Sequence, residues 1–375
     1  MIAIEQVDVN SKKDVNRFIQ IPFRLYKNHP QWVPPIIADI ETMMNPKKHP
    51  FYEHSSADFF IATRDGEDVG RIACLENKPF NAYHGKKDAE FYLFDLENDQ
   101  EIANCLFERA FDWAIERGLD TFVGPKGFSP FDGYGIQVEG FEHRQMMTMM
   151  NYNYNYYSTM VENLGFEKEV DFISCYFNAR EMHFPEKVHR MAERVVQRGT
   201  FKVLRFKNKA HLVSWGKRIG EAYNKTFINN WEYYPLTERE VKFTMDQLIT
   251  FADPRLIKII THNDEVVGFL FAFQDVSAAL QRAKGKINPI SIGDLLLEVK
   301  RTKWVSLNGV GILPEYQGLG GNILLYSEME KTVHEYQFEH ADLTQVAETA
   351  VNMRNDLMNV GGQPYKNHRV YHKKI

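Results

Sequence analysis

The chain resembles itself at a fixed distance, and this internal repeat constrains its fold more than any other feature. Residues 59–75 read FFIATRDGEDVGRIACL, and residues 257–273 read IKIITHNDEVVGFLFAF. Each stretch has an apolar strand, a turn signal and a second strand that opens with Val-Gly. The turn residues, Asp65-Gly66 and Asn263-Asp264, tolerate the backbone angles of a tight hairpin. The repeat predicts two β-hairpins at corresponding places in two similar units.

A second correspondence follows at nearly the same offset. Asn163-Leu164-Gly165 ends a helical pattern before the strand-like residues 172–177, and Asn359-Val360-Gly361 does so before residues 368–372. Glycine just after a helix supplies the left-handed residue that commonly ends it. Between these landmarks each half has the pattern of a long helix followed by a strand. The predicted helices are 99–117 and 321–336, and the predicted strands around them are 121–123, 304–312 and 341–346.

The predicted fold class is α/β, with a mixed sheet in each of two tandem domains. A chain of 375 residues is too long for one ordinary core. The expected domains are residues 1–180 and 201–375, joined by a charged linker at 181–200 for which a helix is also expected.

Composition limits the partners. The net charge of −5 argues against a nucleic-acid binder, which usually carries a basic excess. No apolar stretch approaches the roughly 20 residues of a membrane span, so no membrane partner is expected. The three cysteines, Cys74, Cys105 and Cys175, have no paired spacing and predict reduced thiols. The expected location is the cytoplasm.

The residues that carry chemistry lie in the stretch 304–326, WVSLNGVGILPEYQGLGGNILLY. An apolar strand ends at Pro314, and a glycine-rich turn at 317–322 leads directly into a helix. Glycines allow the backbone to approach a pyrophosphate, and the free amides at the helix start point towards it. A P-loop would need Lys and Ser or Thr after its glycine, where Asn322-Ile323 stands. A dinucleotide fingerprint would need a different glycine spacing. A turn that serves packing alone is the remaining alternative.

This stretch resembles the acyl-CoA motif of the GNAT superfamily, Gln/Arg-x-x-Gly-x-Gly/Ala. Gln317 and Gly320 match it, and Asn322 departs from its last small position. The order of elements around the motif also resembles a GNAT domain over about 203–375. The chain is also similar to a group of bacterial tandem-domain GNAT acetyltransferases, at Pro30-x-Trp32-Val33-Pro34-Pro35 and Gly361-Gly362-x-x-Tyr365-Lys366 among other places.

The resemblance implies an N-acyltransferase that moves an acetyl group from acetyl-CoA to a primary amine of a small molecule or peptide. The acetyl-CoA-binding residues that it implies are Val310, Gly311, Ile312, Gln317, Gly318, Leu319, Gly320, Gly321, Asn322 and Asn352. Glu348 is the first candidate for the catalytic base and Glu232 is the second. Leu357 stands where many GNAT enzymes have a tyrosine acid, and Ala350 where many have an asparagine. A CoA-binding protein without activity and a transferase of longer acyl or aminoacyl groups are therefore the alternatives.

The first half lacks the glycine turn, and its acidic residues Asp95, Glu97 and Asp99 would repel a pyrophosphate. It is expected to be a degenerate GNAT-like domain. An insertion at 125–157 ends in a tyrosine-rich run, for which a substrate pocket, an interdomain seam and a homodimer surface are all consistent interpretations. No metal site is expected, because His368 and His372 lie on a predicted strand and His49 and His54 have no evident third ligand.

Overall fold

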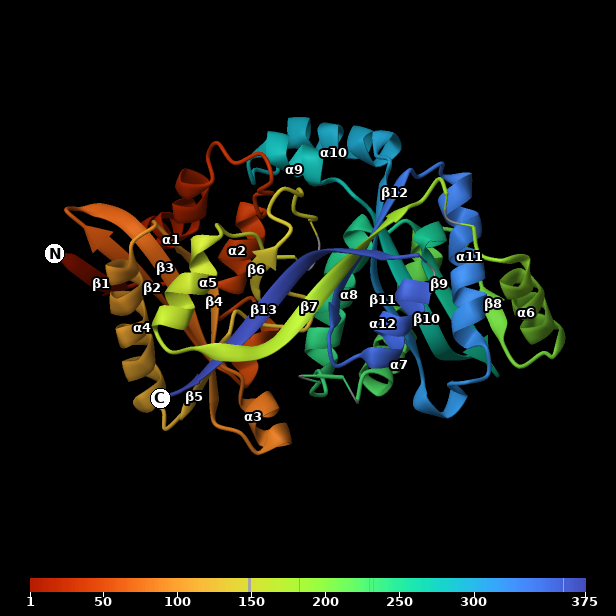
Figure 1. Ribbon diagram of the computed structural model, residues 1–375, viewed down its shortest axis with the longest axis horizontal. Coiled ribbons are helices and arrows are strands. Elements are labelled where there is room, and N and C mark those ends of the chain that lie inside the picture. Colours follow the sequence, from red (N-terminus) through yellow and green to blue (C-terminus); the bar gives the residue numbers. More distant parts are fainter. Residues whose placement is uncertain (148–149, 182, 229, 232, 360) are drawn as a thin grey trace. The chain divides into compact units, whose positions relative to one another are not determined.

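The computed structural model describes residues 1–147, 150–181, 183–228, 230–231, 233–359 and 361–375, and it divides into two compact units. Unit 1 combines Met1–Ile173 with Val276–Glu298 and Tyr365–Ile375. Unit 2 combines Ser174–Asp275 with Val299–Pro364. Each unit has a mixed sheet with helices on both faces, which is the α/β class that the sequence predicts (Figure 1).

The elements that lie in unit 1, three of which end or begin in unit 2, are β1 (Ile2–Gln6), α1 (Lys12–Leu25), α2 (Ile37–Met43), β2 (Ser56–Arg64), β3 (Glu67–Glu76), α3 (Lys78–His84), β4 (Asp88–Leu96), α4 (Gln100–Ile115), β5 (Thr121–Gly124), β6 (Ile136–Glu139), α5 (Tyr156–Asn163), β7 (Glu167–Asn178), α9 (Ser277–Ala283), α10 (Pro289–Arg301) and β13 (Gln363–Lys374).

The sheet of unit 1 runs β1-β2-β3-β4-β5-β13. Its pairs are antiparallel except for β4 with β5. Alternate residues of the β2 strand face opposite cores, as the two-residue period of a strand requires. Phe60 and Ala62 belong to the core under α4, whereas Phe59 and Ile61 belong to the core under α1. The predicted hairpin at 59–75 is thus confirmed as β2 and β3, buried on both faces.

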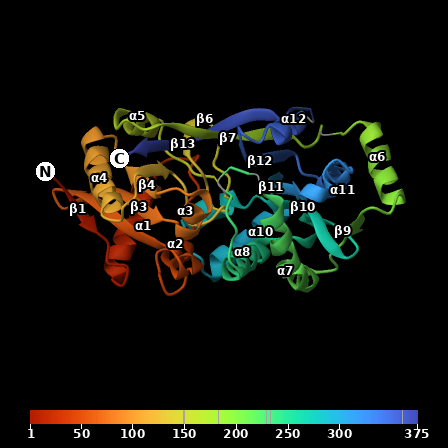
Figure 2. The ribbon, with the colours of Figure 1, turned by 90° about the horizontal axis from the view of Figure 1, so that it is seen from below.

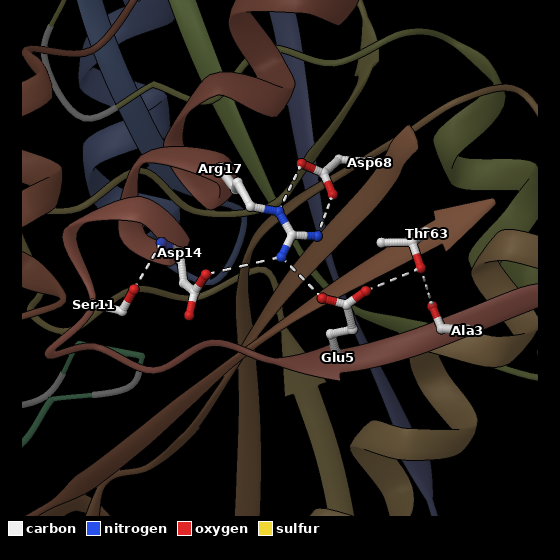
Figure 3. A network of polar contacts seen from close by, with 7 residues as sticks. All are labelled: Ala3, Glu5, Ser11, Asp14, Arg17, Thr63 and Asp68. Carbon is white, nitrogen blue, oxygen red and sulfur yellow. Dashed lines mark hydrogen bonds and ion pairs between the residues drawn. The ribbon is translucent and has the colours of Figure 1, made fainter. Parts of the chain in front are cut away.

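A polar network fastens α1 to the sheet of unit 1 (Figure 3). Ser11 caps the helix by accepting from the amide of Asp14, at 3.3 Å. One turn later, the Arg17 guanidinium contacts Asp68 at 2.7 Å and Glu5 at 2.9 Å. These carboxylates raise the pKa of Arg17, so the guanidinium stays charged. The network fixes the register of α1 against β1 and the hairpin.

The elements of unit 2 are α6 (Glu186–Gln197), β8 (Lys202–Leu204), α7 (Lys209–Thr226), α8 (Glu238–Phe251), β9 (Ile257–His262), β10 (Glu265–Gln274), β11 (Trp304–Ile312), α11 (Gly321–Glu335), β12 (His340–Ala347) and α12 (Val351–Asn359). The strand order is β12-β11-β10-β9-β8, and the Ser174–Asn178 end of β7 lies beside β12. The helices α7 and α8 cover one core of this sheet, with Phe269 and Phe271 at its centre. The second predicted hairpin is confirmed as β9 and β10. The segment 181–200, for which a helix was expected, contains α6.

The two units share an irregularity that the sequence did not reveal. In unit 2, Phe271 lies opposite Gly309 and Ala272 opposite Leu307, so Asn308 is an extra residue in β11. In unit 1, a bulge interrupts the corresponding strand β4, and Leu93 there has a φ of 45°. The corresponding strand is therefore bulged in both halves of the repeat, at nearly the same place.

Candidate functional site

The glycine turn of unit 2 joins the end of β11 to the start of α11. Gly318 and Gly320 have φ values of 75° and 87°, which side chains disfavour. The side-chain nitrogen Nε2 of Gln317 donates to the carbonyl of Ile312 at 3.2 Å, which ties the turn to the strand. The amides of Gly321 and the next two residues lie in the first turn of α11, where no residue of that helix can accept from them. An anion would find both donors and a favourable helix dipole here.

Close packing holds this turn in place. A Cβ atom on Gly320 would lie 2.7 Å from Cγ2 of Val195, which belongs to α6. A Cβ on Gly321 would lie 2.9 Å from side-chain carbons of Ile260 and Ile312. A Cβ on Gly318 would meet nothing within 4 Å. A side chain at Gly320 or Gly321 would therefore force its neighbours to move, whereas the space beside Gly318 is open.

Next to the turn, the parallel strands β11 and β12 separate. Their pairing joins Trp304–Leu307 to His340–Leu343 and ends there, although both strands continue. The bulge at Asn308 lies directly after the last paired residue. Beyond it, Val310 is only half-buried, while Gly311 is fully packed, with a Cβ position 2.3 Å from a Thr226 methyl carbon. The predicted thioester-holding residues Val310, Gly311 and Ile312 thus line one edge of the split.

A buried polar network that was not predicted from the sequence lies at the base of this split. Asp342 of β12 has no exposed surface, and its carboxylate accepts from the Thr344 hydroxyl at 2.6 Å. The Thr344 hydroxyl is also 3.1 Å from that of Ser306 on β11. Aspartate is depleted inside strands. Asp342 within the predicted strand 341–346 was therefore the available signal.

The other predicted residues lie around the same edge of unit 2 or outside the described residues. Glu348 is half-buried and directly follows β12, at the carboxyl end where β11 also ends. Asn352 is exposed in the first turn of α12. Leu357 is buried in α12 and has no proton to give. Glu232 falls outside the described residues, so its place in the site stays a prediction.

Tyr326 is a further candidate for the residue that gives a proton to the leaving group, and it was not predicted from the sequence. It lies on α11, and its hydroxyl is 3.9 Å from the sulfur of Met353 on α12. Burial raises the pKa of Tyr326, so the phenol keeps its proton at neutral pH. It is a protonated donor on one of the helices that follow the separating strands.

In unit 1 the corresponding place is filled by the chain itself. The parallel pairing of β4 with β5 ends at Glu90 and Val123. The amide of Lys126 then donates to the carbonyl of Phe91 at 2.9 Å, and its ammonium pairs with the Glu90 carboxylate at 2.7 Å. Burial raises the pKa of Glu90 and lowers that of Lys126. The amide of Leu96 donates to the buried Tyr157 hydroxyl at 3.0 Å. In unit 1, residues of the same unit therefore fill the place at which the parallel strands of unit 2 separate.

The acidic residues at the end of β4 have structural partners. Asp95 forms a buried ion pair with Arg71 at 2.7 Å. Asp99 caps α4 by accepting from the amide of Glu101 at 2.9 Å, and it also contacts Arg64. The start of α4 thus already has the carboxylate of Asp99 at its free amides.

The tyrosine-rich run packs inside unit 1, where Tyr154 stacks on Tyr26 at 4.9 Å between ring centroids.

A cluster of histidines surrounds a buried carboxylate on α11. Glu330 accepts from the amide of Phe184 at 3.0 Å, and its other oxygen is 3.1 Å from Nε2 of His189. His334 and His183 contribute nitrogens at 3.7 and 4.0 Å from the carboxylate. The ligand atoms of His183, Glu330 and His334 lie within 4.8 Å of one another. Since Glu330 already has an amide and an imidazole as neighbours, these contacts fasten α6 and the residues before it to α11.

A mixed sheet whose parallel strands separate beside a glycine turn and a helix start is characteristic of the GNAT fold. Unit 2 has this arrangement, and unit 1 has the same order of strands with the separation filled. The fold is that of two tandem GNAT domains. A tandem GNAT protein from the clavulanic acid biosynthesis pathway has the same architecture, with a TM-score of 0.57 and 10% identity, covering 100% of this chain and 98% of that one. No family model matches the chain.

Two curated proteins are similar to the chain along its whole length. One is named "Bacterial ceramide synthase", from Caulobacter vibrioides strain NA1000, and is 29% identical over 377 residues, covering 98% of this chain and 97% of that protein. The other is "Protein YghO" from Escherichia coli K12, 24% identical over 371 residues, covering 97% of this chain and 94% of that protein. No helix in the described part of the chain has the length and apolar character to cross a membrane.

Proposed function

We propose that the protein is an N-acyltransferase that moves a long acyl chain from acyl-CoA to the amino group of a long-chain amino alcohol. The products are an amide and free CoA. The observation that carries this proposal is the similarity to a bacterial ceramide synthase over 98% of the chain. A ceramide is the amide of a long fatty acid with a long-chain amino alcohol. Of the donors considered from the sequence, the longer acyl-CoA is therefore preferred to acetyl-CoA.

The glycine turn supports CoA as the carrier. Gly318 has open space where a side chain would stand, and the first amides of α11 follow it. The pyrophosphate of CoA carries the charge that such a helix start favours. We place it at Gln317–Asn322, with the thioester beside Val310–Ile312 on the edge of β11. Backbone amides on that edge would stabilise the oxyanion that forms on the thioester carbonyl.

The reaction needs a neutral amine, so one proton must leave the nitrogen. The amine nitrogen attacks the carbonyl carbon and gives up a second proton, the C–S bond breaks, and the CoA thiolate leaves and takes up a proton. Asp342 is our first candidate for the base, because its carboxylate is buried at the base of the split and bonded to Thr344. Glu348 is the second. Leu357 supplies no acid, but a thiol with a pKa of about 8.5 leaves without one. Tyr326 on α11 is our candidate for a protonated donor, because burial raises the pKa of its phenol.

The test is acyl transfer by the purified full chain, with donors from acetyl-CoA to palmitoyl-CoA and sphinganine as the amine. Free thiol is measured with a thiol reagent, and the amide is identified by mass spectrometry. The expected result is amide formation with the long donors and at least about a tenfold lower kcat/KM with acetyl-CoA, since each buried CH₂ contributes about 0.8 kcal/mol. Sphinganine with its amine already acetylated is the matched control and should release no thiol.

Two outcomes would overturn the proposal. A chain that binds CoA but transfers only acetyl groups, to short amines, would be the N-acetyltransferase that the sequence alone suggested. A chain that binds no CoA at all would leave the fold without the carrier chemistry. An activity that survives in Asp342→Asn but is lost in Glu348→Gln would move the base to Glu348.

A further inference from the structure

The helix α10 exposes apolar side chains where a surface helix normally carries polar ones. Ile290 is 85% exposed and Leu296 is 63% exposed. Ile287, Ile292 and Leu297 are exposed as well, so five of the large hydrophobic side chains at the described surface lie within eleven residues of sequence. An exposed apolar cluster of this kind marks an interaction site.

The pattern along α10 is inverted relative to an ordinary surface helix. At about 100° per residue, Ile290, Ile292, Leu296 and Leu297 fall on one arc of about 160°. The opposite side carries Ser291, which is buried, with Asp294 and Glu298. Both carboxylates contact Arg282 of α9, Asp294 at 2.8 Å. The polar side chains therefore face α9, and the apolar ones face solvent.

The helix is held by contacts on its polar side and at its start. The Asn288 side chain accepts from the amides of Ile290 and Ser291, each at 3.0 Å, which caps the first turn. Before α10, the carbonyl of Gly285 accepts from the amide of Ile37 at 2.9 Å. The side-chain nitrogen of Gln281 donates to the carbonyls of Pro30 and Trp32, in the loop before α2. The apolar face is thus presented by an anchored helix, of which residues 289–298 belong to unit 1.

Basic side chains border this face. Lys284 and Lys286 precede α10, Lys300 and Arg301 form its last turn, and all four are exposed. The two acidic residues of the helix are already bound to Arg282, and the segment 282–301 carries five basic and two acidic residues, a net charge of +3. The whole chain has a net charge of −5, which makes this concentration of positive charge local.

We propose that α10 docks on a membrane surface that contains anionic lipids. The helix would lie in the plane of the interface, with its apolar arc among the acyl chains and its lysines against the headgroups. The expectation that no membrane partner exists considered only spanning segments, and α10 is too short for one. Such docking would bring a two-chain or long-chain lipid within reach of the protein, but it does not depend on the proposed acyl transfer.

The experiment is sedimentation of the full chain with vesicles, without any CoA or amine. One set of vesicles is an equal mixture of phosphatidylglycerol and phosphatidylcholine, and the other is phosphatidylcholine alone. The wild type is expected to bind the anionic vesicles at least tenfold more tightly, since each basic residue near the surface contributes about fivefold. The variant Leu296→Glu/Leu297→Glu is expected to lose at least tenfold. Ile115→Glu/Val213→Glu is the matched control, because both residues are exposed and lie on other helices, α4 and α7.

Salt provides a second readout. Raising it from about 0.1 M to about 1 M shortens the screening length from about 10 Å to about 3 Å and should release most of the bound protein. The proposal is overturned if wild type stays in solution with both vesicles, or if the Leu296/Leu297 variant binds like wild type. It is also overturned if sedimentation velocity shows a dimer that the variant breaks, with no vesicle binding, because a second copy of the chain would then cover the face. A chain that binds vesicles but transfers no acyl group would refute the proposed function alone.

Discussion

A negative charge introduced into the first turn of α11 should change the stability of the fold and the binding of CoA in opposite directions. Asn322 is the second residue of this helix and is half-buried. In Asn322→Glu, a carboxylate at the helix start should stabilise the fold by about 0.3–1 kcal/mol through the helix dipole. A pyrophosphate bound by the same amides would lie about 5 Å away, where repulsion is about 3 kcal/mol per unit charge at an effective dielectric constant of about 20. Screening and partial exposure reduce this, so we expect a net loss of about 1–2 kcal/mol in CoA binding.

The assay is calorimetric titration of CoA into wild type and variant, together with urea unfolding of both. A loss of 1–2 kcal/mol corresponds to a 5- to 30-fold weaker Kd. Asn322→Gln, which keeps the charge, should bind CoA within about threefold of wild type. A variant that unfolds at higher urea but binds CoA as tightly as wild type would refute the placement of the pyrophosphate at this turn. A variant that unfolds earlier would show that α11 does not begin where we place it.

Three further predictions follow from the geometry. Asp342→Asn should lower kcat by about 10²–10⁴-fold and leave KM nearly unchanged, in steady-state kinetics of the acyl transfer, if the carboxylate is the base. Gly320→Ala should lower the free energy of unfolding by about 1–2 kcal/mol, because its φ is 87° and the new methyl group meets Val195, and adding Val195→Ala should restore part of that loss in urea unfolding. Burial lowers the pKa of His368 to about 4, so the unfolded chain, with its histidine near 6.5, binds the extra proton between these values and stability falls as pH drops through this window. Between pH 7 and pH 5 wild type should lose about 2 kcal/mol more than His368→Gln, whose amide can still donate to the carbonyl of Asn151, as measured by urea unfolding at each pH.

The elements that the sequence predicted well are those whose signals are local. The hairpins at 59–75 and 257–273 have apolar strands around residues that suit tight turns, and both formed as expected. The glycine turn at 317–322 was visible because a left-handed φ and close packing require glycine, and the structure has both there. The helix at 186–197 was expected from the charged segment, but its packing against Gly320 was not.

Features that depend on pairing between distant strands could not be read from the chain. The separation of β11 from β12 is a property of their register, and no residue type announces where parallel pairing ends. The bulge at Asn308 is likewise defined only against β10. Asp342 was overlooked because a single charged residue in an apolar strand is easily read as an edge position. The exposed face of α10 was overlooked because an inverted helix has the same hydrophobic period as an ordinary one.

The last strand of the chain sets the order in which the protein can be completed. β13 forms its antiparallel pairs with β5 and β6, which are encoded more than 200 residues earlier. Domains usually fold as they leave the ribosome, the N-terminal one first. Here the N-terminal unit stays without one of its central strands until the other unit has been synthesised. Until then, the unpaired N–H and C=O groups at the edge of β5 can form hydrogen bonds with strands of other chains. A truncation that removes only the final eleven residues should therefore damage the half of the protein that was made first.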